Sequence, residues 1–423
     1  MELIAFIAVA LMFLAYATVS AKLEGTVLTA PLLFVAFGFL IGTGGLDLAD
    51  VDLSHSMLHL VAELTLILVL FSDAARIDLK LVRRDHNLPL RMLVLGLPLA
   101  VVVGTATAAW LFPGFGLWEA ALLAALLAPT DAALGQPVVS NPAVPRRIRQ
   151  AINIESGLND GIALPAVLLF AALASMHGGG ESQDWLTFGL LQIVLGPLAG
   201  IAIGYVGAKL IDGAAERGAV STSFQGIAIL ALACLAYLAS EAIGGNGFIA
   251  AFVGGMVFGN TIKNECHFLF EFMETEGQLL MLITFIVFGM ALLPEGLVDL
   301  QPMHVVYACL SLTVIRMLPI ALSLVGSGVS MPTIGFLGWF GPRGLASILF
   351  VLLILEEADI PHAVDILSVT VLTVALSTLL HGVTAAPFAN AYSRLAARMG
   401  ECEESKPVAD MPLREGPMSA ERN

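Results

Sequence analysis

Thirteen apolar runs, each long enough to cross a lipid bilayer, take up most of the 423 residues of this chain. A transmembrane helix needs about 20 mainly apolar residues, and helices are favoured in lipid because they satisfy their own backbone hydrogen bonds. The sequence therefore predicts an all-α polytopic membrane protein with about thirteen transmembrane helices. The runs cover residues 3–21, 26–44, 57–74, 89–112, 117–135, 150–175, 186–210, 222–241, 246–262, 275–293, 303–325, 332–355 and 363–390.

The composition agrees with a bilayer environment and leaves little chain outside it. Hydrophobic residues make up 58% of the chain and charged residues only 13%, against about 25% charged residues in soluble domains. We expect one membrane domain over residues 1–400 and a short, charged tail over residues 401–423 that is disordered. We interpret the first run as a helix rather than a signal peptide, because no Lys or Arg precedes it.

Positive charges indicate which connections face the cytoplasm. Of the 19 Lys and Arg residues, Arg316 and Arg343 lie inside runs, and the other seventeen lie in or beside connections that follow odd-numbered runs. Connections after even-numbered runs contain no Lys or Arg and carry acids such as Asp47 and Glu181. Because cytoplasmic loops are rich in Lys and Arg, we expect the N-terminus outside and the C-terminus in the cytoplasm, in a cell inner membrane.

Charge and motifs also exclude some classes of protein. The net charge of −15 argues against a nucleic-acid partner, since no basic stripe is present to neutralise phosphates. None of the eight histidines forms an H-E-x-x-H metal motif, and no G-x-S-x-G nucleophile motif occurs. We therefore expect no enzyme activity and no cofactor.

Two of the runs are interrupted. Run five contains Pro-Thr-Asp at 129–131, and run twelve contains Gly-Pro-Arg-Gly at 341–344. Proline removes a backbone donor and disrupts the preceding helical turn. The two interruptions are seven runs apart, which an inverted repeat predicts, with runs one to six matching runs eight to thirteen. The alternative is a pair of ordinary proline kinks.

Ionisable residues inside membrane runs cost about 2.5–3.5 kcal/mol each and point to function. We expect Asp131 to balance amides freed in run five and Arg343 to balance carbonyls freed in run twelve, which are structural roles. Asp73 ends run three next to Arg76, and we interpret it as part of a surface ion pair or as a helix-end contact. The ionisable residues inside the runs that we single out are Glu63, Asp131, Glu155, Asp160, Arg316 and Arg343.

Run six holds the densest polar cluster. At about 100° per residue, Glu155 and Asn159 share one helix face, while Ser156 and Asp160 share the adjacent one. Two carboxylates this close repel each other, so one is expected to have a fixed cation. We expect Arg316 to pair with Glu155, either as a structural pair or as part of the site, which leaves Asp160 to bind and release a proton.

These elements resemble the motifs of monovalent cation/proton antiporters of the NhaP and NHE kind. Residues 155–161 resemble the E-S-x-x-N-D signature, residues 129–131 the T-D element of the broken helix, and residues 341–344 the G-x-R-G element. Glu63 and Arg316 also fit, so the resemblance covers runs three to twelve. This chain departs from the pattern in having Gly157 where Leu is usual and Pro-Thr-Asp-Ala-Ala at 129–133.

The resemblance implies roles for these residues. Asp160 would bind the cation and the proton in turn, and Ser156, the Thr130 backbone and Glu63 would be Na⁺ ligands or gating carboxylates. Asn159 in place of a second aspartate is similar to the electroneutral branch, with one proton per cation. The family also implies a homodimer, with runs 4–6 and 11–13 forming a moving core and runs 1–3 and 7–10 a dimerisation unit.

The sequence therefore predicts an electroneutral Na⁺/proton antiporter that works by alternating access and serves pH homeostasis. Asp160 would carry either ion and cross the barrier only when neutralised, since a bare carboxylate is costly in lipid. A carrier of organic anions on the same inverted-repeat fold is the alternative, because fold does not fix function. The choice among Na⁺, Li⁺ and K⁺ stays open.

Overall fold

The computed structural model describes residues 2–23, 25–48, 55–80, 82, 87–175, 182–263, 267–357, 359–399 and 403–406. Its elements in these ranges are helices, as the hydropathy predicts. They are α1 Glu2–Leu23, α2 Ala30–Ile41, α3 His55–Ala75, α5 Asn87–Arg91, α6 Leu97–Leu111, α7 Leu117–Leu126, α8 Ala132–Val139, α9 Arg146–Ser175, α10 Ser182–Glu216, α11 Thr222–Ala242, α12 Gly247–Thr261, α13 His267–Val287, α14 Leu293–Gly296, α15 Pro302–Leu312, α16 Val314–Ser323, α17 Met331–Trp339, α18 Leu345–Glu357 and α19 Ala363–Ala396. π-helical turns at Met92–Gly96 and Phe288–Leu292 join α5 to α6 and α13 to α14.

Each predicted run coincides with one helix or with consecutive helices. Within the described residues, seven helices are both long enough and apolar enough to cross a membrane, and five shorter apolar helices accompany them. The multi-pass architecture is therefore clear, whereas the count of thirteen crossings stays a prediction.

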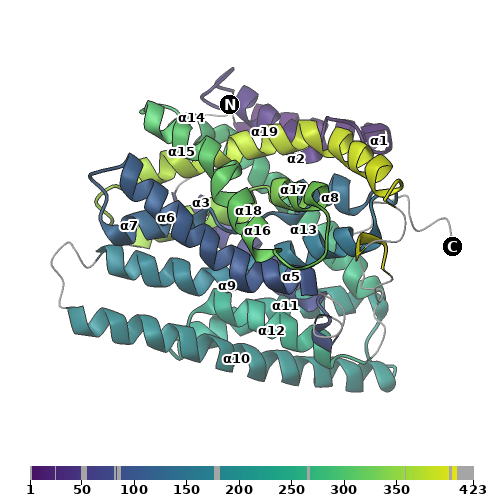
Figure 1. Ribbon diagram of the computed structural model, residues 1–423. Coiled ribbons are helices and arrows are strands. Elements are labelled where there is room, and N and C mark those ends of the chain that lie inside the picture. Colours follow the sequence, from purple (N-terminus) through teal and green to yellow (C-terminus); the bar gives the residue numbers. More distant parts are fainter. Residues whose placement is uncertain are drawn as a thin grey trace.

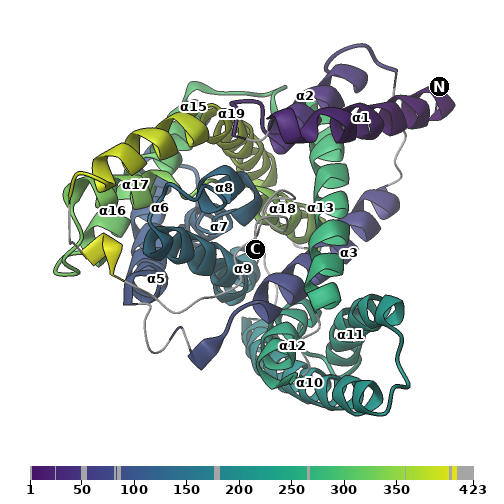
Figure 2. The same ribbon diagram turned by 90° about the vertical axis from the view of Figure 1, so that its right-hand side faces the viewer.

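The helices lie in two groups (Figures 1 and 2), and α13 packs against α2, α3 and α11. One group contains α5–α9 and α15–α19, and the other contains α1–α3 and α10–α12. Within the first group α7 packs against α6 and α9, and α19 packs against α15, α18 and α8. The assignment of runs 4–6 and 11–13 to a moving core and of runs 1–3 and 7–10 to a dimerisation unit stays a prediction.

Both predicted interruptions are present in the structure. The chain leaves the helical conformation between α7 and α8, at residues 127–131, and again between α17 and α18, at residues 340–344. Run eleven contains a break that the sequence analysis did not predict, at Thr313 between α15 and α16 (φ −115°, ψ −91°). The equivalence of the two halves as an inverted repeat stays a prediction.

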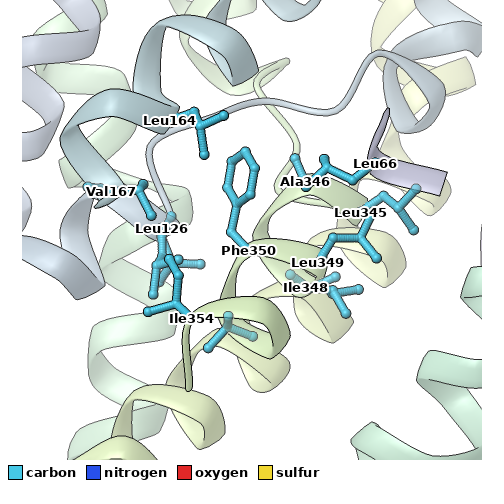
Figure 3. Close-up of a cluster of buried hydrophobic side chains, with 14 of the residues drawn as sticks. Leu66, Leu126, Leu164, Val167, Leu345, Ala346, Ile348, Leu349, Phe350 and Ile354 are labelled. Atoms are coloured by element: carbon cyan, nitrogen blue, oxygen red, sulfur yellow. The ribbon is translucent and has the colours of Figure 1, made fainter. Parts of the chain in front are cut away.

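Helix α18 lies inside the first group, where its side chains are buried among three other helices (Figure 3). Phe350 is 1% exposed and extends from α18 toward Leu164 of α9, near Leu126 of α7. Leu66 of α3 belongs to the same cluster. Burying these side chains fixes α18 against both α9 and the first interrupted helix.

The tail differs in part from the expected disorder. Residues Glu403–Ser405 form one 3₁₀ turn that folds back onto the helices. Glu403 pairs with Arg147 at 2.8 Å, and Glu404, only 2% exposed, accepts hydrogen bonds from the Ser330 N–H and the Thr333 hydroxyl, both at 2.8 Å. Composition missed this contact because it depends on donors that lie at the starts of α9 and α17. The other tail residues, 401–402 and 407–423, lie outside the described residues.

Glu404→Gln is expected to loosen this turn. Burial disfavours the charged form, but the hydrogen bonds from Ser330 and Thr333 outweigh it and lower the pKa of Glu404 from 4.5 to about 2. The ionised carboxylate therefore stabilises docking above pH 4.5, and this contribution is lost as the pH falls from 4.5 toward about 2. Hydrogen–deuterium exchange of residues 403–406 at pH 7 should rise about tenfold in the variant, since hydrogen bonds to charged groups contribute about 1.5–3 kcal/mol.

Glu216→Gln is the matched control, because Glu216 is an exposed carboxylate at the end of α10. It should leave the exchange of residues 403–406 unchanged. Equal exchange in the wild type and the Glu404 variant would show that this carboxylate does not hold the turn.

Candidate ion-binding site

Asp131 connects the two interrupted helices. It is the N-cap of α8, and its Oδ1 accepts the Ala133 N–H at 2.7 Å. Its Oδ2 accepts the Leu345 N–H at 2.8 Å, at the start of α18, and its own N–H donates to the Pro342 carbonyl at 2.8 Å. One carboxylate therefore satisfies the positive N-terminal ends of two half-helices.

Arg343 caps the C-terminal end of a half-helix. Its Nη1 donates to the carbonyls of Ala128 and Pro129, the latter at 3.0 Å, which follow the end of α7. The expectation that Arg343 balances carbonyls of its own run is therefore wrong, because the crossing brings the ends of the other interrupted helix against it. Arg343 is fully buried, at 0% exposed.

Two glycines of the 341–344 element make room for buried charges. A Cβ at Gly344 would overlap the carboxylate of Asp131, and a Cβ at Gly341 would overlap the guanidinium of Arg316. These glycines are therefore explained by close approach of side chains rather than by backbone conformation.

Gly344→Ala is expected to destabilise the protein by about 1–3 kcal/mol, because the displaced Asp131 carboxylate would leave buried amides unsatisfied. Gly335→Ala is the matched control, since Gly335 lies in α17 with nothing within 4 Å of the added Cβ. That control should be neutral or slightly stabilising. Thermal unfolding of the purified variants measures both effects, and equal midpoints for the two variants would contradict this account of Gly344.

Three hydroxyl and amide groups meet beside the first interruption. The Thr130 and Ser156 hydroxyls are 3.0 Å apart, and the Asn159 amide donates to the Thr130 hydroxyl at 2.5 Å. All three side chains are at most 2% exposed. Helix α9 thus brings its polar face directly against the break in run five.

Glu155 and Arg316 form a two-pronged ion pair. Arg316 Nη1 and Nη2 lie 2.5 and 2.7 Å from the two carboxylate oxygens, and both side chains are 2% exposed. These are the partners that the sequence analysis expected. The charge of Glu155 is therefore neutralised inside the helix group, on the face of α9 next to that of Asp160.

Asp160 faces a cavity between the two helix groups. It is 8% exposed and lines the cavity together with Asp131. The other walls come from α3, α8, α13 and α18. The lining residues are Val69, Ser72, Asp73, Arg76, Asp131, Ala133, Gln136, Asp160, Gly277, Gln278, Met281, Leu345 and Ala346.

The positions of residues on α3 differ from expectation. Asp73 and Arg76 are half-buried and line the cavity together with Asp160, and their pairing stays a prediction. Glu63 is half-buried and lies six residues before Val69, the first described residue of α3 in the cavity wall. At 1.5 Å per residue this is about 9 Å along the helix, which places Glu63 away from the open part of the cavity.

The sequence analysis missed several polar residues around the site. Gln136 and Gln278 line the cavity, and Ser377 and His381 of α19 contact the interruption between α17 and α18. A signal existed for His381, because it is an ionisable group in the middle of run thirteen. Gln and Ser are too common in membrane helices to stand out without the neighbouring helices.

A family profile described as "Sodium/hydrogen exchanger, transmembrane" matches residues 8–391. The chain belongs to the sodium/hydrogen exchanger family. This confirms the family indicated by the motifs at 129–131, 155–161 and 341–344, and it places this exchanger-family chain among transporters rather than enzymes.

Curated relatives carry cation/proton antiporter names. The K(+)/H(+) antiporter NhaP2 of Shewanella sp. (strain MR-4) is 25% identical over 355 residues, which cover 83% of this chain and 60% of that protein. The K(+)/H(+) antiporter NhaP of Alkalimonas amylolytica is 24% identical over 400 residues, or 94% and 67% of the two chains. The chain thus spans about 60% of the length of the first of these relatives.

A solved structure shows the same fold. The sodium proton antiporter MjNhaP1 from Methanocaldococcus jannaschii at pH 8 superposes with a TM-score of 0.76 at 19% identity, covering 92% of this chain and 99% of that one. At this level of identity the likeness supports the fold of the exchanger-family chain and not its substrate.

Proposed function

We propose that this chain is an electroneutral monovalent cation/proton antiporter, with Na⁺ as the expected cation and Asp160 as the group that binds cation and proton in turn. The observation that carries the proposal is the unequal setting of two neighbouring carboxylates. Glu155 is neutralised by Arg316 at 2.5 Å, whereas Asp160 faces the cavity. One acid is thus built into the structure, and the other is open to ions that enter.

The groups next to Asp160 suit a small cation. Ser156 and Asp160 lie on the same face of α9, four residues apart, and the Thr130 hydroxyl is 3.0 Å from that of Ser156. Hydroxyl, carboxylate and freed carbonyl oxygens at a broken helix coordinate Na⁺ in inverted-repeat transporters. We therefore propose Asp160, Ser156 and Thr130 as the Na⁺ ligands, with Asn159 orienting Thr130 and Asp131 and Arg343 holding the crossing.

The shape of the cavity supports alternating access. Its α3 wall is the end that leads into the connection carrying Arg76 and Lys80, which the charge rule places in the cytoplasm. On the other side of Asp160, Leu164 and Phe350 belong to a packed cluster of buried apolar side chains (Figure 3). We therefore propose that this conformation is inward-open and that Glu63, on the closed side, has a gating role.

The transported cation is the open point of the proposal. Relatives at about 25% identity are named K(+)/H(+) antiporters, and the structural relative is named a sodium proton antiporter. K⁺ and Na⁺ are both monovalent cations that a carboxylate can exchange for a proton. We expect exchange with Na⁺, and K⁺ is the first alternative cation to measure.

Proteoliposomes that contain a trapped pH dye test this function. Na⁺, Li⁺ and K⁺ are added separately, and each cation that the protein accepts should dissipate an imposed pH gradient. The membrane potential is then clamped at zero or at −100 mV with an ionophore for an ion that is not transported. This change of potential should not alter the rate of cation/proton exchange. A rate that follows the potential would contradict electroneutral exchange. Absence of proton flux with all three cations would contradict antiport.

A carrier of organic anions on the same fold is the competing function. The cavity contains Asp73, Asp131 and Asp160 and one guanidinium, that of Arg76, so an anion would meet mostly like charge. Uptake of labelled succinate or acetate into the same vesicles tests this directly.

We also propose a homodimer in the inner membrane with a cytoplasmic C-terminus, which crosslinking and a C-terminal reporter would check.

A further inference from the structure

We propose that Ser377 and His381 of α19 are positioning residues for the ion site and act through the interruption between α17 and α18. The inference rests on the proposed function, because it concerns the same cation site. Both side chains are buried, at 0% and 1% exposed, and neither lines the cavity that contains Asp160. Outside α19, their hydrogen bonds are to two backbone groups at the ends of the interruption, the Trp339 carbonyl, which also accepts the Gly341 N–H at 2.8 Å, and the Arg343 N–H.

The two ends of the interruption are held by this one helix. Trp339 is the last residue of α17, and its carbonyl lies 2.9 Å from His381 Nε2. Arg343 precedes α18, and its N–H donates to the Ser377 hydroxyl at 2.7 Å. A carbonyl and an amide freed by a broken helix need such partners in a membrane.

The imidazole of His381 joins the two contacts. Nε2 faces the Trp339 carbonyl at 2.9 Å, and Nδ1 faces both the carbonyl of Ser377 at 3.0 Å and its hydroxyl. We assign the proton to Nε2, which then donates to the Trp339 carbonyl, an assignment made from the network. Nδ1 of the neutral ring then accepts the Ser377 hydroxyl, 3.2 Å away, while that hydroxyl oxygen accepts the Arg343 N–H. The Trp339 ring stacks on His381 with centroids 5.1 Å apart, which fixes the plane of the imidazole.

Arg343 transmits this constraint to the cation ligands. Among the described residues its guanidinium makes hydrogen bonds through Nη1 only, and Nε and Nη2 have no partner. The position of the Arg343 guanidinium therefore depends on the position of the Arg343 backbone. Nη1 bonds the carbonyl of Pro129, the residue before Thr130, so a shift of Arg343 displaces a proposed ligand.

Four variants test the inference. Ser377→Ala and His381→Phe remove the two links, while His381→Gln keeps an N–H donor near the position of Nε2. Thr378→Val is the matched control, since Thr378 is equally buried on α19 and its hydroxyl bonds Val374 within its own helix. The assay is cation-dependent proton flux in proteoliposomes, with KM and maximal rate measured separately.

We expect Ser377→Ala and His381→Phe to raise the KM for the cation by about fivefold or more, with a smaller change in maximal rate. His381→Gln should recover most of the affinity lost in His381→Phe, and Thr378→Val should match the wild type. An unchanged KM with loss of folded protein or of maximal rate would show a merely structural role and overturn the inference.

A measurement without transport separates this inference from the proposed function. In detergent, Ser377→Ala should speed hydrogen–deuterium exchange of residues 127–135 as well as 340–346, although the Ser377 hydroxyl accepts its hydrogen bond from Arg343 in the second segment. Faster exchange at 340–346 alone would overturn the coupling, whatever the flux assay gives. Absence of proton flux in the wild type would instead contradict the antiporter proposal. The coupling between the two interruptions would then be decided by hydrogen–deuterium exchange alone.

Discussion

Asp160→Asn is expected to reduce cation/proton exchange by at least about two orders of magnitude. Asparagine has nearly the same size and fits the same place on α9, but it neither binds a proton near neutral pH nor offers a negative charge to a cation. Asp160 is the α9 carboxylate that lines the cavity. The effect should be seen as loss of dye dequenching at every cation concentration.

The thermal unfolding midpoint of this variant should stay close to that of the wild type, because asparagine matches the size of aspartate and can occupy the same place on α9. Asp73→Asn is the comparison variant, since Asp73 lies in the wall of the same cavity on α3. We expect it to change the apparent affinity by a few fold, as a charge that concentrates cations does. Wild-type exchange in Asp160→Asn would disprove the assignment of the ion-binding carboxylate.

Glu155→Gln is expected to have the largest effect on stability. Removing one partner of a buried ion pair costs about 3–5 kcal/mol, because the other charge is left without compensation. The uncompensated charge would be that of Arg316, which is 2% exposed and packs closely against Gly341. Lower yield of folded protein and a lower thermal unfolding midpoint in detergent are the expected results.

The double variant Glu155→Gln with Arg316→Gln provides the control. It removes both charges, so it should be more stable than the sum of the two single effects implies. Protein of the Glu155 variant that does fold should still exchange ions, since Asp160 is intact. Single variants as stable as the wild type would show that the pair contributes little to the fold.

The interruptions could be predicted from sequence because proline, glycine and charge depart locally from an otherwise apolar pattern. The pairing of Glu155 with Arg316 followed from the scarcity of buried cations. The partner of Arg343 could not be deduced, because sequence does not fix which half-helix lies opposite it. The carbonyls of Ala128 and Pro129 come from the other interrupted helix.

The sequence also could not predict which residues along a helix line the cavity. Glu63 and Asp73 both lie on α3, but only the arrangement of α3 against α9 and α13 decides that Asp73 lines the cavity. The contact of Glu404 with α17 was missed for a similar reason. Its partners, Ser330 and Thr333, lie more than 70 residues earlier in the chain.

The mutual capping of the interrupted helices has a consequence for biogenesis. Asp131 and Pro129 receive their partners from residues 214 positions later in the chain. While the ribosome is still making the second half, the first interruption sits in or near the membrane with exposed carbonyls and a bare carboxylate, each costly in lipid. Helix insertion can therefore proceed in order, but the crossing closes only after Leu345 has been synthesised. The two halves must complete their folding together.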